Sequence, residues 1–229
     1  MTEFEFPIRK NLRAAWNLFT AHVWYFVLLS FVMFVLSASS EWHDSIIIKI
    51  LATAATIVWS YVGISSMLAA VDGKVELLKF DALKLHLPTW RQALYLVGVI
   101  FGVGIITLGG LILLVIPGIY FMIKLLFSNF ALVDRNGGVR QSMRFSWHMV
   151  RGDVFWTVLL CFVTSAAVMI LGLLAFFVGI IVTYPIAMLF LALLYRALTN
   201  HRPVEAVVVQ AQELSPAPAD ESAPAVAVQ

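Results

Sequence analysis

The residue in this chain best placed to do chemistry is Lys124, which follows Pro117 by seven residues inside an apolar run. A cation deep in a bilayer costs about 2.5–3.5 kcal/mol on insertion scales, and such residues commonly face a bundle interior. A lysine stem can instead extend to the headgroups. No acidic residue lies clearly inside an apolar run, so no counter-ion is evident. We expect Lys124 to face the interior near Tyr184 and Pro185, and a ligand-binding and a structural role both stay open.

A second candidate is the pattern Arg-x-x-x-Arg-x-x-Trp, which occurs twice, each time shortly before an apolar run. Its members are Arg9, Arg13, Trp16, Arg140, Arg144 and Trp147. On a helix the three side chains of each copy fall on one face. At the headgroup level Arg can bind phosphate and Trp can lie in the interfacial belt. The two faces are therefore candidates for binding anionic lipid headgroups.

Other reactive side chains form no recognisable site. The histidines are scattered, and no pair has the spacing of metal ligands. The chain contains no nucleophile elbow, no P-loop and no paired aspartates within an apolar run. Its one cysteine, Cys161, cannot form a disulfide within the chain. We therefore predict no metal, no cofactor and no enzymatic activity.

The composition indicates that lipid surrounds most of these residues. Of the 229 residues 62% are hydrophobic and 12% are charged, and the mean hydropathy is +0.94. Soluble domains carry about 25% charged residues, so this chain could not cover its surface in water. The net charge is only +2, which argues against nucleic-acid binding. The sequence predicts an all-α polytopic membrane helix bundle.

The apolar runs predict about six membrane spans, followed by a disordered tail over residues 203–229. The expected spans cover roughly residues 18–38, 45–70, 92–116, 118–133, 154–174 and 178–198. Residues 154–195 carry no charge, and a run of 42 residues is long enough for two spans of about 20. Pro117 and Gly118 predict the turn between the third and fourth spans, because proline presets φ and glycine tolerates positive φ.

The basic residues predict how these spans are oriented. Thirteen of the fifteen Lys and Arg residues lie in the N-terminus, in 71–91, in 134–152, or at Arg196 and Arg202. With six spans these segments share one side, and the positive-inside rule assigns that side to the cytoplasm. We expect a multi-pass protein of the cytoplasmic membrane with both termini in the cytoplasm.

An internal repeat relates the two ends of the membrane domain, residues 1–202. Residues 8–32 align with 139–163 without a gap, and the Arg-x-x-x-Arg-x-x-Trp patterns coincide. Both copies enter from the same side, so the repeat would be parallel, with its axis along the membrane normal. Spans 1–2 would then correspond to spans 5–6, around a central hairpin of spans 3–4. In span 3, Gly98 and Gly102 have the spacing that lets helices approach closely.

The central segment, residues 109–152, resembles a known family. The resemblance is carried by Ile116, Pro117, Gly118, Lys124, Asp134, Ser142, Ser146 and Trp147. The family comprises bacterial six-helix membrane proteins grouped with the membrane domain of glycerophosphoryl diester phosphodiesterases, together with related domains of unknown function. It implies a six-helix protein of the cytoplasmic membrane. Where the phosphodiesterase activity exists, it belongs to a separate soluble domain, so the resemblance does not extend the enzyme name to this chain.

Two functional interpretations follow. The first is a non-enzymatic membrane protein that organises lipids or protein partners. The alternative is a small transporter or channel in which Lys124 lies in a cavity that binds an anion or a headgroup. A transporter should place several polar side chains around Lys124, and by depth the nearby candidates are Ser128, Asn129, Thr183 and Tyr184.

Overall fold

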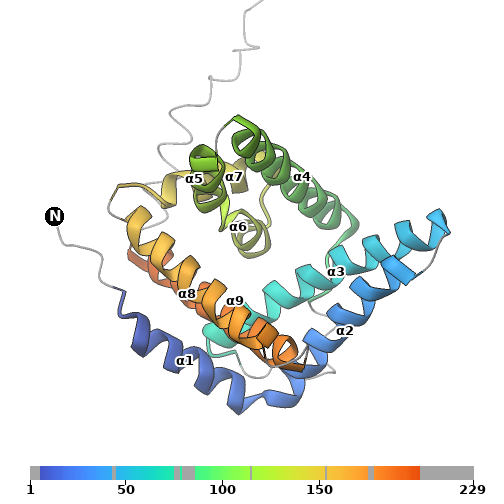
Figure 1. Cartoon of the computed structure of the whole chain (residues 1–229), viewed down its shortest axis with the longest axis horizontal. Helices are drawn as coiled ribbons and strands as arrows, with labels where there is room; N and C mark the ends of the chain where they lie inside the picture. Colours follow the sequence, from blue (N-terminus) through green and yellow to red (C-terminus); the bar gives the residue numbers. More distant parts are fainter. Residues whose placement is uncertain are drawn as a thin grey trace, which may run out of the picture.

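The computed structural model describes residues 6–42, 45–74, 78, 86–113, 115–152, 154–174 and 178–201. The predicted tail over 203–229 lies outside this set, as does most of the polar segment 75–85. Every long element within the described ranges is a helix, which confirms the all-α prediction (Figure 1). The helices are α1 (Ile8–Ala21), α2 (Val23–Trp42), α3 (Ile46–Val71), α4 (Trp90–Leu113), α5 (Val115–Leu125), α6 (Ser128–Arg135), α7 (Val139–Met149), α8 (Val154–Leu174) and α9 (Val178–His201).

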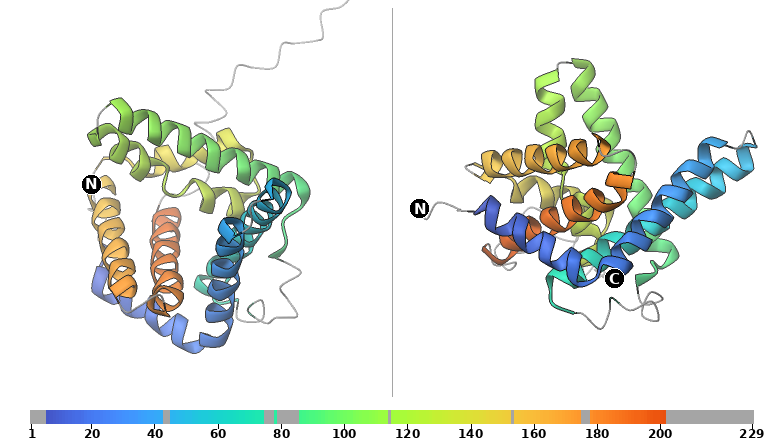
Figure 2. Two further views of the ribbon diagram at one scale, coloured as in Figure 1. Left: turned by 45° about the vertical axis from the view of Figure 1, so that its right-hand side comes forward. Right: turned by 60° about the horizontal axis from the view of Figure 1, so that its bottom comes forward.

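Three helical hairpins form the body of the molecule. The two helices within each of the pairs α2–α3, α4–α5 and α8–α9 pack against each other. Between the hairpins, α6 contacts α3 and α4, and α9 contacts α2 and α3 (Figure 1). The α2–α3 and α4–α5 hairpins project in different directions (Figure 2). Side chains near the hairpin tips are largely exposed, among them Ile46, Ile112 and Leu174 at 71%, 85% and 77%. The other ends of the hairpins converge on a buried core that includes Phe190 and Tyr195. The exposed apolar tips suit contact with lipid rather than water.

Within the described residues, five segments are long and apolar enough to cross a membrane, and the bent pair of α1 and α2 makes a sixth. The predicted start of span 1 near residue 18 needs correction, because α1 continues to Ala21 and meets α2 at an angle of 92°. Helix α1 is amphipathic, with Ala15 and Phe19 buried and Arg9 and Arg13 exposed, whereas α2 is predominantly apolar and has no distinct polar face. A basic amphipathic helix favours the plane of an interface. The change of direction therefore coincides with the change of helix type.

The predicted turn at Pro117 and Gly118 also needs correction. Helix α4 ends at Leu113 and α5 begins at Val115, so both residues lie in the first turn of α5. Proline is tolerated there because N–H groups in the first turn lack helical partners. Gly118 serves close packing rather than positive φ, since a Cβ on it would lie 2.8 Å from the Cα of Leu111. Span 4 is divided by a break between α5 and α6 at residues 126–127.

Gly98 and Gly102 of α4, which we predicted to allow a close approach of helices, pack against the basic helix α7. A Cβ on Gly98 would lie 2.7 Å from Cγ2 of Val139, and one on Gly102 would lie 3.2 Å from Sδ of Met143. The predicted close packing is thus confirmed, and its partner is a short amphipathic helix rather than another span. These glycines allow α7 to lie directly against α4.

The two predicted repeat copies have the same order of elements. In both α1–α2–α3 and α7–α8–α9, a short amphipathic helix precedes a hairpin of two apolar helices. Their surroundings differ, because α1 packs against α9, whereas α7 packs against α4, α5 and α6. The duplication stays a prediction from the sequence.

Topology can be tested with single cysteines in a Cys161→Ala background. We expect Ser40→Cys to react with a membrane-impermeant maleimide in intact cells, because Ser40 lies near the tip of the α2–α3 hairpin. Lys79→Cys and Ser215→Cys should react only after permeabilisation. The Cys161→Ala parent, which has no cysteine, controls for background labelling. External labelling at residue 215, or protection at residue 40, would contradict six spans with cytoplasmic termini.

Candidate functional site

Lys124 lies in the last turn of α5 and is only 5% exposed, so the prediction that it faces the bundle interior is confirmed. Its Nζ donates a hydrogen bond to the carbonyl oxygen of Val150. Val150 is the C-cap of α7, where the helical ladder ends and carbonyl groups lose their regular partners. The described contacts of Lys124 therefore lie on and around α7 rather than at Tyr184 and Pro185.

Aromatic rings provide the rest of the surroundings of the ammonium group. Nζ lies 5.5 Å from the ring centroid of Tyr120 and 5.4 Å from that of Trp147. The face of an aromatic ring attracts a cation through its quadrupole, and the attraction strengthens when water is excluded. Trp147 is itself stacked on Phe121, with ring centroids 5.9 Å apart. Among the described ion pairs none involves Lys124, so a carbonyl and two rings take the place of a counter-ion.

Ser146 completes the link between these helices. Its Oγ donates to the carbonyl oxygen of Lys124 at 2.8 Å and accepts from the backbone N–H of Phe127 at 3.2 Å. Both backbone groups border the break between α5 and α6, where regular i to i−4 hydrogen bonds are interrupted. We call Lys124, Phe127, Ser146 and Val150 the α5–α7 junction. It supplies partners for backbone groups that lipid could not satisfy.

The two basic faces are only partly alike. Arg9, Arg13, Arg140 and Arg144 are all exposed, as an interfacial role requires. The tryptophans differ: Trp16 is 50% exposed, whereas Trp147 turns toward Lys124. The arginines of the two copies are thus alike in being exposed, whereas the tryptophans differ in their surroundings.

The basic character of α7 also affects its histidine. Burial lowers the pKa of His148, and the positive charges of Arg144, Arg151 and Lys124 lower it further. The imidazole is therefore neutral at pH 7, although cations surround it. This end of α7 carries a positive potential, which favours anions over cations.

An open groove runs between α4 and α7. Its volume is about 430 Å³, and apolar side chains form most of its surface. The lining residues are Ile106, Leu125, Val139, Arg140, Met143, Arg144 and Trp147. Five of them lie on α7, at the first, second, fifth, sixth and ninth positions of that helix, so they share one side of it. The second basic face therefore borders an apolar groove.

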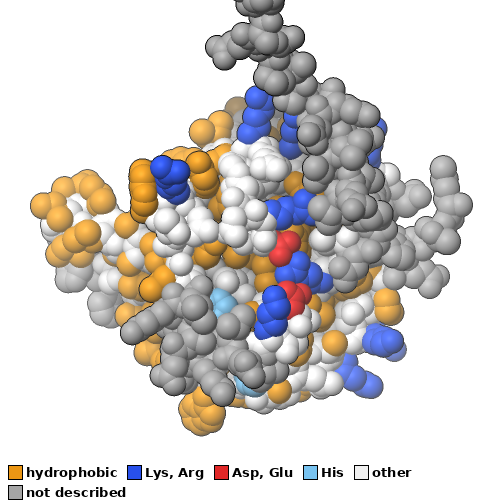
Figure 3. Space-filling model, turned by 180° about the vertical axis from the view of Figure 1, so that it is seen from behind, with side chains coloured by type: hydrophobic (Ala, Val, Ile, Leu, Met, Phe, Trp, Pro, Cys, Tyr) orange, Lys and Arg blue, Asp and Glu red, His pale blue; other side chains and the backbone are white. Residues whose placement is uncertain are grey.

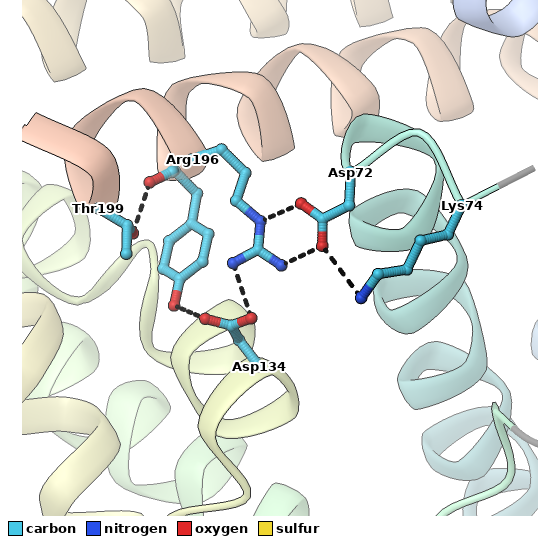
Figure 4. Close-up of polar contacts among 6 residues, drawn as sticks. Asp72, Lys74, Asp134, Arg196 and Thr199 are labelled. Atoms are coloured by element: carbon cyan, nitrogen blue, oxygen red, sulfur yellow. Dashed lines mark hydrogen bonds and ion pairs between the residues drawn. The ribbon is translucent and has the colours of Figure 1, made fainter. Parts of the chain in front are cut away.

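A second polar site, the charged cluster, joins three helices where the hairpins converge (Figure 4). Arg196 of α9 contacts Asp72, the C-cap of α3, through Nε and Nη2, each at 2.7 Å. Its Nη1 lies 2.7 Å from Oδ1 of Asp134 on α6, and Tyr195 donates to Oδ2 of Asp134 at 2.9 Å. Charge-assisted bonds with two-point geometry are among the stronger polar contacts in proteins. Acidic and basic side chains gather near the centre of one face of the molecule (Figure 3).

Sequence reasoning did not find this cluster. Asp134 drew notice only through the family resemblance, and Arg196 only as one of the cytoplasmic charges. Asp72 and Arg196 are 124 residues apart in the sequence, so no local spacing pattern could have predicted their contact. The available signal was that each charged residue lies at the end of an apolar helix, where it can remain hydrated while pairing with others.

The polar residues expected around a transport cavity do not gather at Lys124 in the described contacts. Thr183 donates to the carbonyl of Gly179 within α9 at 2.9 Å. Ser128 is buried, and its Oγ has no hydrogen-bond partner within the described residues. The described contacts of Lys124 involve backbone and aromatic groups instead.

Comparison of the chain with protein-family models, with curated proteins and with solved structures finds no match. The resemblance to the six-helix family thus stays a prediction carried by the residues of the central segment. The structure does bring three of those residues together, since Lys124, Ser146 and Trp147 all take part in or border the α5–α7 junction. The geometry of this chain must therefore carry the functional conclusion.

Replacing Lys124 by Met tests the α5–α7 junction. We expect a lower melting temperature in detergent, because the buried carbonyl of Val150 loses its donor, at a cost of about 1–3 kcal/mol. Lys124→Arg should retain more stability than Lys124→Met, since it can still donate to that carbonyl. Lys49→Met is the matched control: Lys49 also lies in an apolar helix but is exposed, and its replacement should leave the melting temperature unchanged. Unchanged stability in Lys124→Met would contradict a structural role.

Replacing Arg196 by Met tests the charged cluster. Two carboxylates lose their common cation, and we expect a loss of about 1–3 kcal/mol of unfolding free energy, moderated because the cluster is partly hydrated. Adding Asp134→Asn should recover part of the loss by removing one unpaired charge. Lys74→Met provides the control. Nζ of Lys74 lies 3.9 Å from Oδ2 of Asp72, but the side chain is 63% exposed, so its loss should have little effect on stability. Equal effects of Lys74→Met and Arg196→Met on chemical or thermal unfolding would refute the cluster's role.

Proposed function

We propose that this protein is a non-enzymatic integral membrane protein that binds and organises anionic lipids through its basic amphipathic helices α1 and α7. The observation that carries this proposal is the exposure of all four arginines of the repeated pattern, Arg9, Arg13, Arg140 and Arg144. Each pair lies on a short helix next to an apolar helix long enough to enter a membrane. Each arginine near an anionic surface contributes about 1 kcal/mol of attraction.

The proposed orientation brings these arginines to the right surface. The positive-inside rule places α1 and α7 on the cytoplasmic side, where anionic lipids give the leaflet a negative potential. The apolar faces of the two helices are buried against the rest of the protein, at Ala15 and Phe19 in α1 and at Phe145 and Met149 in α7. Their arginines thus remain free to contact headgroups.

The surroundings of Lys124 favour this proposal over transport. A cation that holds a transported anion should offer its donors to a cavity. Lys124 instead donates to Val150 and lies against Tyr120 and Trp147. We assign it a structural role at the α5–α7 junction, so lipid binding is the function that the exposed arginines support.

Removing the four arginine charges tests the proposal. We expect the variant with Arg9, Arg13, Arg140 and Arg144 all replaced by Gln to co-purify several-fold less phosphatidylglycerol and cardiolipin per protein than the wild type. Lipid quantified by mass spectrometry after mild detergent extraction provides the measurement. The matched control replaces four other basic residues by Gln, namely Lys49, Lys74, Lys84 and Arg91. Equal lipid retention by both variants would show that the basic faces do not recruit anionic lipid.

A further inference from the structure

We infer that the groove between α4 and α7 is a binding site for one anionic phospholipid, with its phosphate between Arg140 and Arg144 and an acyl chain along Ile106 and Leu125. This inference rests on the proposed function and makes it specific. The site distinguishes the face of Arg140 and Arg144, which borders the groove, from the face of Arg9 and Arg13 on α1.

The packing of α7 on α4 creates the groove. Gly98 and Gly102 let α7 approach closely, because Val139 and Met143 lie where glycine Cβ atoms would otherwise be. The helices therefore meet along a line without bulky side chains from α4, and a channel remains beside that line. Its volume of about 430 Å³ falls within the range of roughly 300–1,000 Å³ typical of ligand pockets.

The charges at the groove complement a phosphate diester. Arg140 and Arg144 are one helical turn apart on the same side of α7, and both are exposed. Like charges at this spacing repel each other, and an anion between them removes the repulsion. No acidic residue is among the side chains that line the groove, and the described ion pairs include neither arginine. The other cations near this end of α7, Lys124 and Arg151, add to the positive potential.

The remaining lining complements an acyl chain. Both Ile106 of α4, which is 38% exposed, and Leu125 of α5, which is buried, line the groove. Trp147 borders the groove while it covers Lys124, so its ring separates the bound lipid from the buried ammonium. A ligand with one anionic group and one long apolar group therefore matches the two halves of the groove, whereas a free phosphate would match only one.

Native mass spectrometry of the full-length protein in detergent can count bound lipids. We expect the first molecule of phosphatidylglycerol to bind at least tenfold more tightly than phosphatidylcholine with the same acyl chains. Replacing both Arg140 and Arg144 by Gln should abolish this preference. Replacing both Lys74 and Arg91 by Gln, which removes the same charge from exposed positions outside the two basic faces, should leave the first binding event unchanged. Millimolar inorganic phosphate should not displace the lipid.

Groove-filling variants separate a built site from surface attraction. Ile106→Trp keeps every charge but occupies the groove, and it should weaken the first binding event by about tenfold. Met143→Trp fills the groove from α7 and should have the same effect, and an unchanged melting temperature will show that a variant is folded. Normal binding in folded variants of both kinds would overturn the groove site. Equal losses of binding from the Arg140 and Arg144 pair and from the Lys74 and Arg91 pair would also overturn it. If the groove site is overturned but the four-arginine variant still loses co-purified anionic lipid, the proposed function stands without the groove. If that variant also retains its lipid, both the groove site and the proposed function fail.

Discussion

Backbone N–H and C=O groups that leave a helical ladder inside a lipid environment need partners from the protein itself, because lipid supplies none. This chain interrupts its helices twice near the same place, between α5 and α6 and between α7 and α8. Side chains from each region satisfy the backbone of the other. Ser146 hydrogen-bonds backbone groups at the first interruption, and Lys124 donates to a backbone carbonyl at the second. Much of the fold depends on this exchange. It sets α6 in the middle of the bundle and holds α7 beside α4, and that placement exposes the second basic face.

The sequence predicted those parts of the fold that depend on hydrophobicity averaged over a span. The number of apolar segments was predictable in this way. The interior position of Lys124 followed instead from the cost of a cation in lipid, and the close approach at Gly98 and Gly102 followed from their spacing. The breaks were not predictable, because the apolar run through Leu125 to Phe127 shows no change in composition where the helix ends. The start of α2 was misplaced for a related reason. Residues 18–21 are apolar enough for a span, yet they complete the amphipathic helix α1.

In the candidate site, features that depend on one helix were predictable from the sequence, whereas contacts between helices were not. The exposure of Arg140 and Arg144 follows from their positions on an amphipathic helix, so their spacing was sufficient to predict it. Trp16 and Trp147 share the same local sequence pattern, but their surroundings depend on which helix packs nearby, and only Trp147 has Lys124 as a neighbour. The groove depends on both α4 and α7, and no single segment of sequence contains it. Ser146 drew attention only through the family resemblance, which did not indicate its bonds to Lys124 and Phe127.

The charged cluster has a consequence for how the protein is made. Asp72 precedes Arg196 by 124 residues, so at translation rates of about 5–20 residues per second its partner follows after roughly 6–25 s. During that interval Asp72, at the end of the hairpin α2–α3, has only the exposed Lys74 as a described cationic neighbour, and Asp134 also lacks Arg196. Asp72 and Asp134 both lie at helix ends, where water can solvate their carboxylates until α9 is synthesised. The contacts of Arg196 with Asp72 and Asp134 can form only when α9 arrives, so the last helix of the described residues is also the one that joins α3 to α6.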